Sequence, residues 1–433
     1  MNINFAGGLA IPVLVVIVVL VITDTSILDV SKYFFQENDY FNLIAFSVLL
    51  FSSIFSQYIL LKIVGKKIHK FSSLIRNSLY HRLNTFVPFF LLFIIFLILL
   101  EMYITSSYHT ILVSTIIWII YSTAILNMAV LIFQFFQWFK FNKNYVVISY
   151  TIAIIAILAN LTISVTSVTH NIETGPNIIQ WFYNPVQSFS NVPNFMALIY
   201  GITSVITFIS MWLSSVLMLS HYAKKYGIVR FGFMIVTPLI YFLSLFSPWL
   251  HFFFQFFSHD YPYMVNLTYS ILSSSAKPIG GFLFGLIFWT ASKTIDNKLL
   301  KEYMVIAGFG IMILFTSNQI FDLMRPDYPP FGLVTVSFFV LGSYISFLGI
   351  YASAVCVAQD RELRQILRKS SEKNINLFNQ IGKSQMEKKL MATANSAMKK
   401  FKDESGVPTF EEEDYKKYVE DAIREIQKEK RTS

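Results

Sequence analysis

The chain has 433 residues, of which 55 % are hydrophobic, 17 % are aromatic and only 14 % are charged. Soluble domains carry about 25 % charged residues, so this composition excludes an ordinary soluble globular protein. The net charge of +9 does not predict binding to nucleic acid, because the basic residues lie in short segments between apolar runs. The single cysteine, Cys356, excludes an intrachain disulfide and a cysteine-based metal cluster.

Apolar runs of about 20 residues, the length that crosses the hydrocarbon core of a bilayer, recur along most of the chain. They lie near 6–22, 41–61, 86–105, 111–137, 145–168, 195–218, 231–254, 264–291, 304–323 and 332–357. The sequence therefore predicts an all-α fold, a polytopic transmembrane helical bundle of about ten spans in contact with the lipid bilayer.

The loop charges predict the orientation of this bundle. Segments after the second, fourth, sixth and eighth spans contain 14 lysine and arginine residues, whereas those after the odd-numbered spans contain only Lys32 and Arg325. Basic loops remain on the cytoplasmic side of a membrane. We therefore expect a multi-pass protein of the cell membrane with both termini in the cytoplasm.

The C-terminal part of the chain differs sharply in composition. From residue 360 onward lie 31 of the 59 charged residues, which predicts a transmembrane domain over 1–358 and a charged cytoplasmic helical tail over 359–433. No helix breaker separates the last span from the tail, so we expect one uninterrupted helix with a phase slip near Gly382. Such a tail is suited to binding a cytoplasmic protein through residues 360–430.

The most unusual local pattern surrounds Lys277 in the eighth span. Lys277 is the only lysine or arginine within a predicted span, and Pro278, Gly280 and Gly281 follow it directly. A lysine in the membrane centre is costly, so it is expected to face protein or water rather than lipid. The functional interpretation is an anion- or proton-handling site at a broken helix. The alternatives are a structural kink whose lysine satisfies loose carbonyls, and a span that begins only near Lys277 after a re-entrant segment.

Two acidic residues are candidate partners for Lys277. Glu101 lies near the end of the third predicted span, and Asp322 lies at the end of the ninth, where Asn318 shares its helix face at a spacing of four residues. The candidate binding residues are thus Lys277, Glu101, Asn318 and Asp322. For the two acids, simple hydration at the membrane interface is the competing interpretation.

Motifs of known enzymes and of cofactor sites are absent from the sequence. There is no glycine-rich phosphate loop, no nucleophile signature and no kinase motif, so neither an enzymatic activity nor a cofactor is predicted. The histidines expected on the outer side, His109, His170, His251 and His259, do not have the spacing of a metal-binding motif. No metal site is predicted.

Three stretches of the last 170 residues resemble an uncharacterised family of polytopic membrane proteins from ammonia-oxidising archaea. They are Lys277-Pro278-Ile279-Gly280-Gly281 with Phe284-Gly285, Tyr328-Pro329-Pro330-Phe331-Gly332, and Ala358-Gln359-Asp360 with Leu363-Arg364-Gln365 and Arg368-Lys369-Ser370. The resemblance implies an archaeal cytoplasmic membrane and no particular activity.

Two functional hypotheses follow from these features. The first is a receptor or signal-coupling scaffold that passes a membrane event to the cytoplasmic tail. The second is a secondary transporter or channel with a broken helix around Lys277. The sequence identifies neither the ligand nor the oligomeric state.

Overall fold

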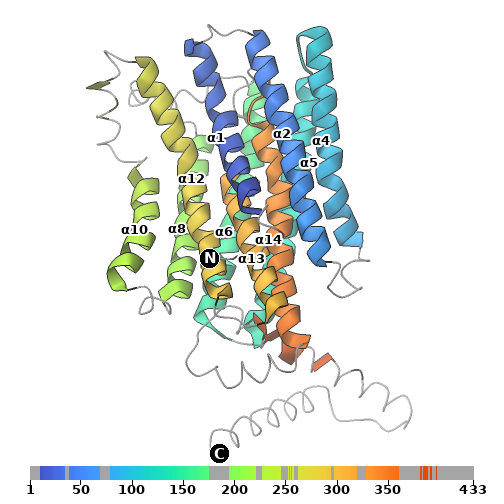
Figure 1. Cartoon of the computed structure of the whole chain (residues 1–433), viewed down its shortest axis with the longest axis vertical. Helices are drawn as coiled ribbons and strands as arrows, with labels where there is room; N and C mark the ends of the chain where they lie inside the picture. The colour runs from blue at the N-terminus through green and yellow to red at the C-terminus, as the bar shows by residue number, and fades with distance from the viewer. Residues whose placement is uncertain are drawn as a thin grey trace, which may run out of the picture. The chain divides into compact units, whose positions relative to one another are not determined.

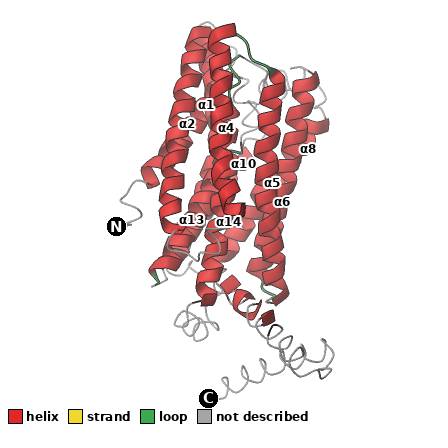
Figure 2. Cartoon of the chain, turned by 90° about the vertical axis from the view of Figure 1, so that its right-hand side faces the viewer, coloured by secondary structure: helices red, strands yellow, loops and turns green. Residues whose placement is uncertain are grey.

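The computed structural model is all-helical in the part of the chain that it describes (Figure 2). The described residues are 10–34, 39–68, 79–141, 143–174, 195–220, 227–244, 252, 254, 256–257, 262–293, 297–318, 328–359, 381–382, 384–388, 391–392 and 396. The helices are α1 (Ala10–Phe34), α2 (Asp39–Ile68), α4 (Leu79–Thr105), α5 (Thr110–Phe141), α6 (Tyr145–Thr174), α8 (Phe195–Ser220), α10 (Ile228–Ser244), α12 (Pro262–Ser292), α13 (Lys298–Thr316) and α14 (Leu333–Gln359).

The helices bury many polar side chains and expose many large apolar ones, unlike the helices of a soluble protein. In α5, Asn127 is fully buried, whereas Leu126 and Phe133 expose 54 % and 60 % of their surface. Eight described helices are long and apolar enough to cross a membrane, and the described apolar stretches of α1 and α10 are shorter. Lipid is the solvent that favours such an exterior, because it cannot satisfy polar groups. The chain is an integral multi-pass membrane protein.

Helix α14 is the central element of the bundle (Figure 1). It packs against α1, α2, α4, α5 and α13, and its side chains are buried on every face over most of its length. A helix that is apolar all round is expected in such a position, because it has no lipid-facing side. By contrast, α10 lies at the edge of the bundle beside α12 and α8 (Figure 1).

Glycines bring α14 and α13 into close contact as an antiparallel hairpin. A Cβ atom added at Gly310 would lie 2.2 Å from the backbone nitrogen of Ser346, and one added at Gly349 would lie 2.3 Å from that of Ala307. Gly342 meets the backbone of Leu314 in the same way. Small residues at such positions let backbones approach closely, which is the main source of helix association in membranes.

Buried hydrogen bonds also join α14 to two helices outside this hairpin, α2 and α5. The side-chain amide of Gln57 in α2 donates to Ser337 Oγ at 2.9 Å, and that of Asn127 in α5 donates to Ser343 Oγ at 3.0 Å. Both acceptors belong to α14. These bonds orient the central helix relative to α2 and α5.

The chain divides into two compact units, Met1–Ser384 and Gln385–Ser433. The first contains all the helices named above and a short segment at residues 381–384. Of the second, only residues 385–388, 391–392 and 396 are described. Most of the predicted tail helices therefore lie outside the described residues.

Candidate functional site

Helix α13 ends inside the bundle, and this end is the framework of the candidate site. Its last residue is Thr316, and Ser317 closes the last turn by donating its backbone N–H to Ile313 O at 2.9 Å. Ser317 and Asn318 are both buried. The last carbonyls of a helix have no partner within it. At this buried end, side chains of neighbouring helices must supply the missing donors.

Lys277 supplies a donor just beyond this end, to the backbone carbonyl of Asn318. It is the middle residue of α12, which runs from Pro262 to Ser292, so about 22 Å of helix separates it from either end. Only 7 % of its surface is exposed. Its Nζ donates to the backbone carbonyl of Asn318 at 2.6 Å and to the hydroxyl of Tyr200 at 2.8 Å. The prediction that Lys277 faces protein rather than lipid is confirmed.

The aromatic ring of Tyr200 also lies near the ammonium group. Lys277 Nζ is 5.2 Å from the ring centroid, within the range of a cation–π interaction. The carbonyl end of α13 carries partial negative charge, which further favours an ammonium group there. Two neutral groups and a helix end therefore stabilise Lys277, and no carboxylate among the described residues contacts it.

A chain of amides extends the site across α6 and α8. Asn318 donates its side-chain amide to Asn160 Oδ1 at 3.1 Å, and Asn160 donates to Thr203 Oγ1 at 3.2 Å. Asn160 comes from α6, and Thr203 and Tyr200 come from α8. We call Lys277, Asn318, Asn160, Tyr200 and Thr203 the lysine cluster. Three helices, α6, α8 and α12, thus meet in one polar layer with Asn318, which lies just beyond the end of α13.

Tyr121 of α5 lies beside the lysine cluster. Its phenol is close enough to that of Tyr200 for the two to interact electrostatically. The side chain is fully buried, and its hydroxyl has no hydrogen-bond partner among the described residues. A buried hydroxyl without a partner is unusual and requires an explanation.

Asp24 was not predicted as a buried residue. The predicted first span ends at residue 22, which placed Asp24 in an outer loop, but α1 continues to Phe34. Asp24 is buried, and its Oδ2 accepts from the backbone N–H of Thr335 at 2.9 Å and from Thr335 Oγ1 at 2.6 Å. Because Thr335 lies in the first turn of α14, the carboxylate acts as an N-cap supplied by another helix.

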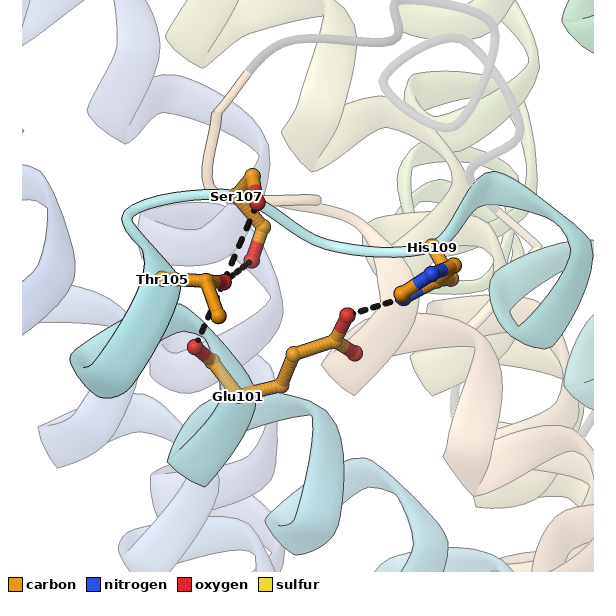
Figure 3. A network of polar contacts seen from close by, with 4 residues as sticks. All are labelled: Glu101, Thr105, Ser107 and His109. Carbon is orange, nitrogen blue, oxygen red and sulfur yellow. Dashed lines mark hydrogen bonds and ion pairs between the residues drawn. The ribbon is translucent and has the colours of Figure 1, made fainter.

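Glu101 is not a partner of Lys277. Figure 3 shows its carboxylate directed to His109 at the α4–α5 connection, where its Oε1 contacts the imidazole Nδ1. In the same connection, Thr105 Oγ1 donates to the Glu101 carbonyl at 2.9 Å and to the Ser107 carbonyl at 3.1 Å. His109 is largely exposed. The predicted role is wrong because the acid stabilises a turn at the bundle surface, near its own helix end.

Asn318 belongs to the site, but not in the predicted way. It was expected inside a helix over 304–323, on one face with Asp322. Instead α13 ends at Thr316, and Asn318 contributes a free carbonyl beyond the helix end. The run Thr316-Ser317-Asn318-Gln319 of polar, turn-forming residues is the signal that could have shown this. Asp322 lies outside the described residues.

The predicted break in the eighth span is also wrong. Helix α12 continues through Pro278 without interruption. A Cβ atom at Gly280 would meet the ring of Phe208 at 2.2 Å, and one at Gly281 would meet Phe315 Cβ at 2.8 Å. The two glycines therefore let α8 and α13 approach the helix closely, and this packing stabilises α12 around its proline.

Ile381 and Gly382 dock near the C-terminal end of α14. Ile381 is fully buried and belongs to the same apolar core as the helices. A Cβ atom added at Gly382 would lie 2.1 Å from Val357 Cγ1. In one straight helix, residues 357 and 382 would be about 37 Å apart. The predicted uninterrupted helix from the last span into the tail is therefore wrong.

Comparisons with known proteins add no relative to this picture: no protein-family model, no curated protein and no solved structure matches the chain.

Proposed function

We propose that the chain is a membrane receptor or signal-coupling scaffold, with the lysine cluster as its sensing site and the C-terminal tail as its output. The observation that carries this proposal is the docking of Gly382 against Val357, which connects the tail segment to the central helix. A change in the position of α14 would alter this contact and therefore the segment that leads into the tail.

The α13–α14 hairpin supports a coupling between the two regions. Its glycine contacts leave no space for one helix to move independently of the other. Lys277 holds the carbonyl end of α13, whereas the docked segment contacts the far end of α14. In the proposal, a displacement at the lysine cluster shifts the hairpin as a unit and changes the docking of residues 381–384.

The proposal includes ten spans with both termini in the cytoplasm. The alternation of basic and non-basic loops along the sequence supports it, with α1 and α10 as the two additional spans. A Cys356→Ser background provides the test, with single cysteines at Ser107 and Lys143. Only the first is expected to react with an impermeant thiol reagent in intact cells.

Hydrogen–deuterium exchange of the full chain in nanodiscs tests the coupling. Lys277→Met is expected to increase exchange at residues 381–384 several-fold, because it loosens the end of α13. Lys62→Met is the matched control, since Lys62 is an exposed lysine that contacts only Tyr58 among the described residues. As a single substitution, with Lys277 unchanged, Gly382→Ala is also expected to raise exchange at residues 381–384. If Lys277→Met leaves hydrogen–deuterium exchange at residues 381–384 unchanged, the coupling is refuted.

A secondary transporter or channel is the second candidate. The observation that favours it is the burial of a lysine in the middle of α12 without a described carboxylate partner, since such residues often mark transport pathways. It no longer has the support of a broken helix, because α12 is continuous. If the protein carries anions into proteoliposomes and Lys277→Met abolishes this flux, the transporter or channel would be favoured over the receptor.

A further inference from the structure

Lys277 has a hydrogen-bond donor that no described group uses. An ammonium group carries three N–H bonds, and two of them donate, to Asn318 O and to Tyr200 Oη. The side chain is almost completely buried. The third N–H therefore lies in the protein interior without a described acceptor, where an unused donor is costly.

The described partners of Lys277 leave its charge unneutralised. A hydroxyl, a carbonyl and an aromatic face stabilise an ammonium group, but none carries a negative charge. The carboxylates of Asp24 and Glu101 are bonded to Thr335 and His109. A buried ammonium group is strongly destabilised when no negative charge accompanies it, and an anion bound among the described groups would remove this cost.

Tyr121 provides a second unused donor. Its hydroxyl has no partner in the described part of the chain, and it lies near Tyr200, the residue that contacts Lys277. Tyr200 thus connects one charged donor, to which it is hydrogen-bonded, with one neutral donor, with which it interacts electrostatically. A bound water molecule would satisfy the hydrogen bonds, whereas a bound anion would also compensate the charge of the ammonium form.

We propose that Lys277 and Tyr121 together bind a small monovalent anion, a halide or a short carboxylate. One ammonium group neutralises one negative charge, so a divalent anion would keep an uncompensated charge in the bilayer. This inference names the class of ligand that the sensing site would bind, and it therefore rests on the proposed function. The binding of the anion can nevertheless be measured independently.

The test is thermal unfolding of the full chain in nanodiscs, in sodium gluconate buffer titrated with sodium chloride or sodium acetate at constant ionic strength. A bound anion raises the midpoint of unfolding in a saturable way. The wild type is expected to respond to chloride or acetate. Lys277→Met is expected to weaken the apparent affinity at least tenfold, whereas Lys277→Arg, which keeps the charge, retains the response. Lys62→Met is the matched control and is expected to leave the response unchanged.

Tyr121→Phe keeps the test decisive should Lys277→Met fail to fold. It removes only the unpartnered hydroxyl and is expected to weaken the apparent affinity several-fold with little effect on stability in gluconate. A wild type without any anion response would overturn the inference and leave Lys277 as a cap on the end of α13. An equal response in the wild type, Lys277→Met and Tyr121→Phe would overturn it as well.

The two proposals can fail separately. Saturable binding with no effect of Lys277→Met on exchange at residues 381–384 would support the anion site and refute the coupling. Coupling without any anion response would refute the site and leave the receptor proposal standing.

Discussion

Replacing Gly310 by alanine is expected to force α13 and α14 apart. The new Cβ atom would lie 2.2 Å from the backbone nitrogen of Ser346 and 2.7 Å from the carbonyl carbon of Ile345. These are backbone atoms of a helix that is buried on all sides, so they cannot move away as a flexible side chain would. Because real Cβ contacts essentially never fall below 3.0 Å, the helices must separate by about 0.8 Å.

Overpacking of this kind typically costs about 1–3 kcal/mol. The separation would also weaken the neighbouring contact of Gly342 with Leu314, so we expect a loss near the upper end of that range. The gain in helix propensity from glycine to alanine, about 1 kcal/mol in water, offsets part of this loss. The net free energy of unfolding should therefore fall by about 1–2 kcal/mol.

Gly65→Ala provides the control for helix propensity. Gly65 lies in α2, and an added Cβ atom would meet nothing within 4 Å. It should leave the free energy of unfolding unchanged or raise it by up to about 1 kcal/mol. Reversible unfolding in mixed detergent micelles measures both variants. If Gly310→Ala proves as stable as Gly65→Ala, the tight hairpin described above does not exist.

Two further substitutions test the polar contacts. Asp24→Leu removes the carboxylate that caps α14 and leaves the Thr335 N–H and hydroxyl unpaired, so unfolding in the same micelles should become easier by about 2–3 kcal/mol; a change below 0.5 kcal/mol would exclude the capping role. Glu101→Gln removes the carboxylate from its contact with His109, whose imidazole is 76 % exposed. Its effect should stay within about 0.5 kcal/mol, with an unchanged anion response; loss of that response would return Glu101 to the site.

The general architecture could be predicted because the bilayer constrains it strongly. Hydrophobic length alone located the apolar runs, and each overlaps a described helix. The ends of the helices were less certain, because hydropathy does not detect a helix that continues through polar residues. Asp24 illustrates this limit: its charge suggested a loop, but a tertiary contact with Thr335 holds it within α1.

Two residues of the lysine cluster were named from the sequence, Lys277 for its charge and Asn318 for its spacing from Asp322. Lys277 is an isolated charge in an apolar run, and its cost in lipid predicts burial. Tyr200 is one of 23 tyrosines, and nothing local distinguishes it from the others. Its role depends on α8 and α12 lying side by side, and one sequence does not contain that information. The mid-span Asn160 was a weaker signal of the same kind as Lys277.

The glycines after Lys277 show why local rules misled the interpretation of the eighth span. Glycine and proline weaken an isolated helix, so their sequence predicted a break. In a membrane bundle, however, glycine also creates the space that a neighbouring helix fills. The contacts of Gly280 with Phe208 and of Gly281 with Phe315 are of the second kind. Which effect dominates depends on whether a partner helix is present, and here two are.

The same packing distinguishes the two proposed functions mechanically. A transporter must open a path past Lys277 on alternate sides, which would require α12 to separate from α13 at Gly281 and Gly285. Contacts as short as those of Gly285 with the backbone of Gly308 oppose such a separation. A receptor needs only a shift of the hairpin by an ångström or so, which changes the docking of Gly382 without breaking the glycine contacts. Tight packing around the buried lysine therefore favours signal coupling.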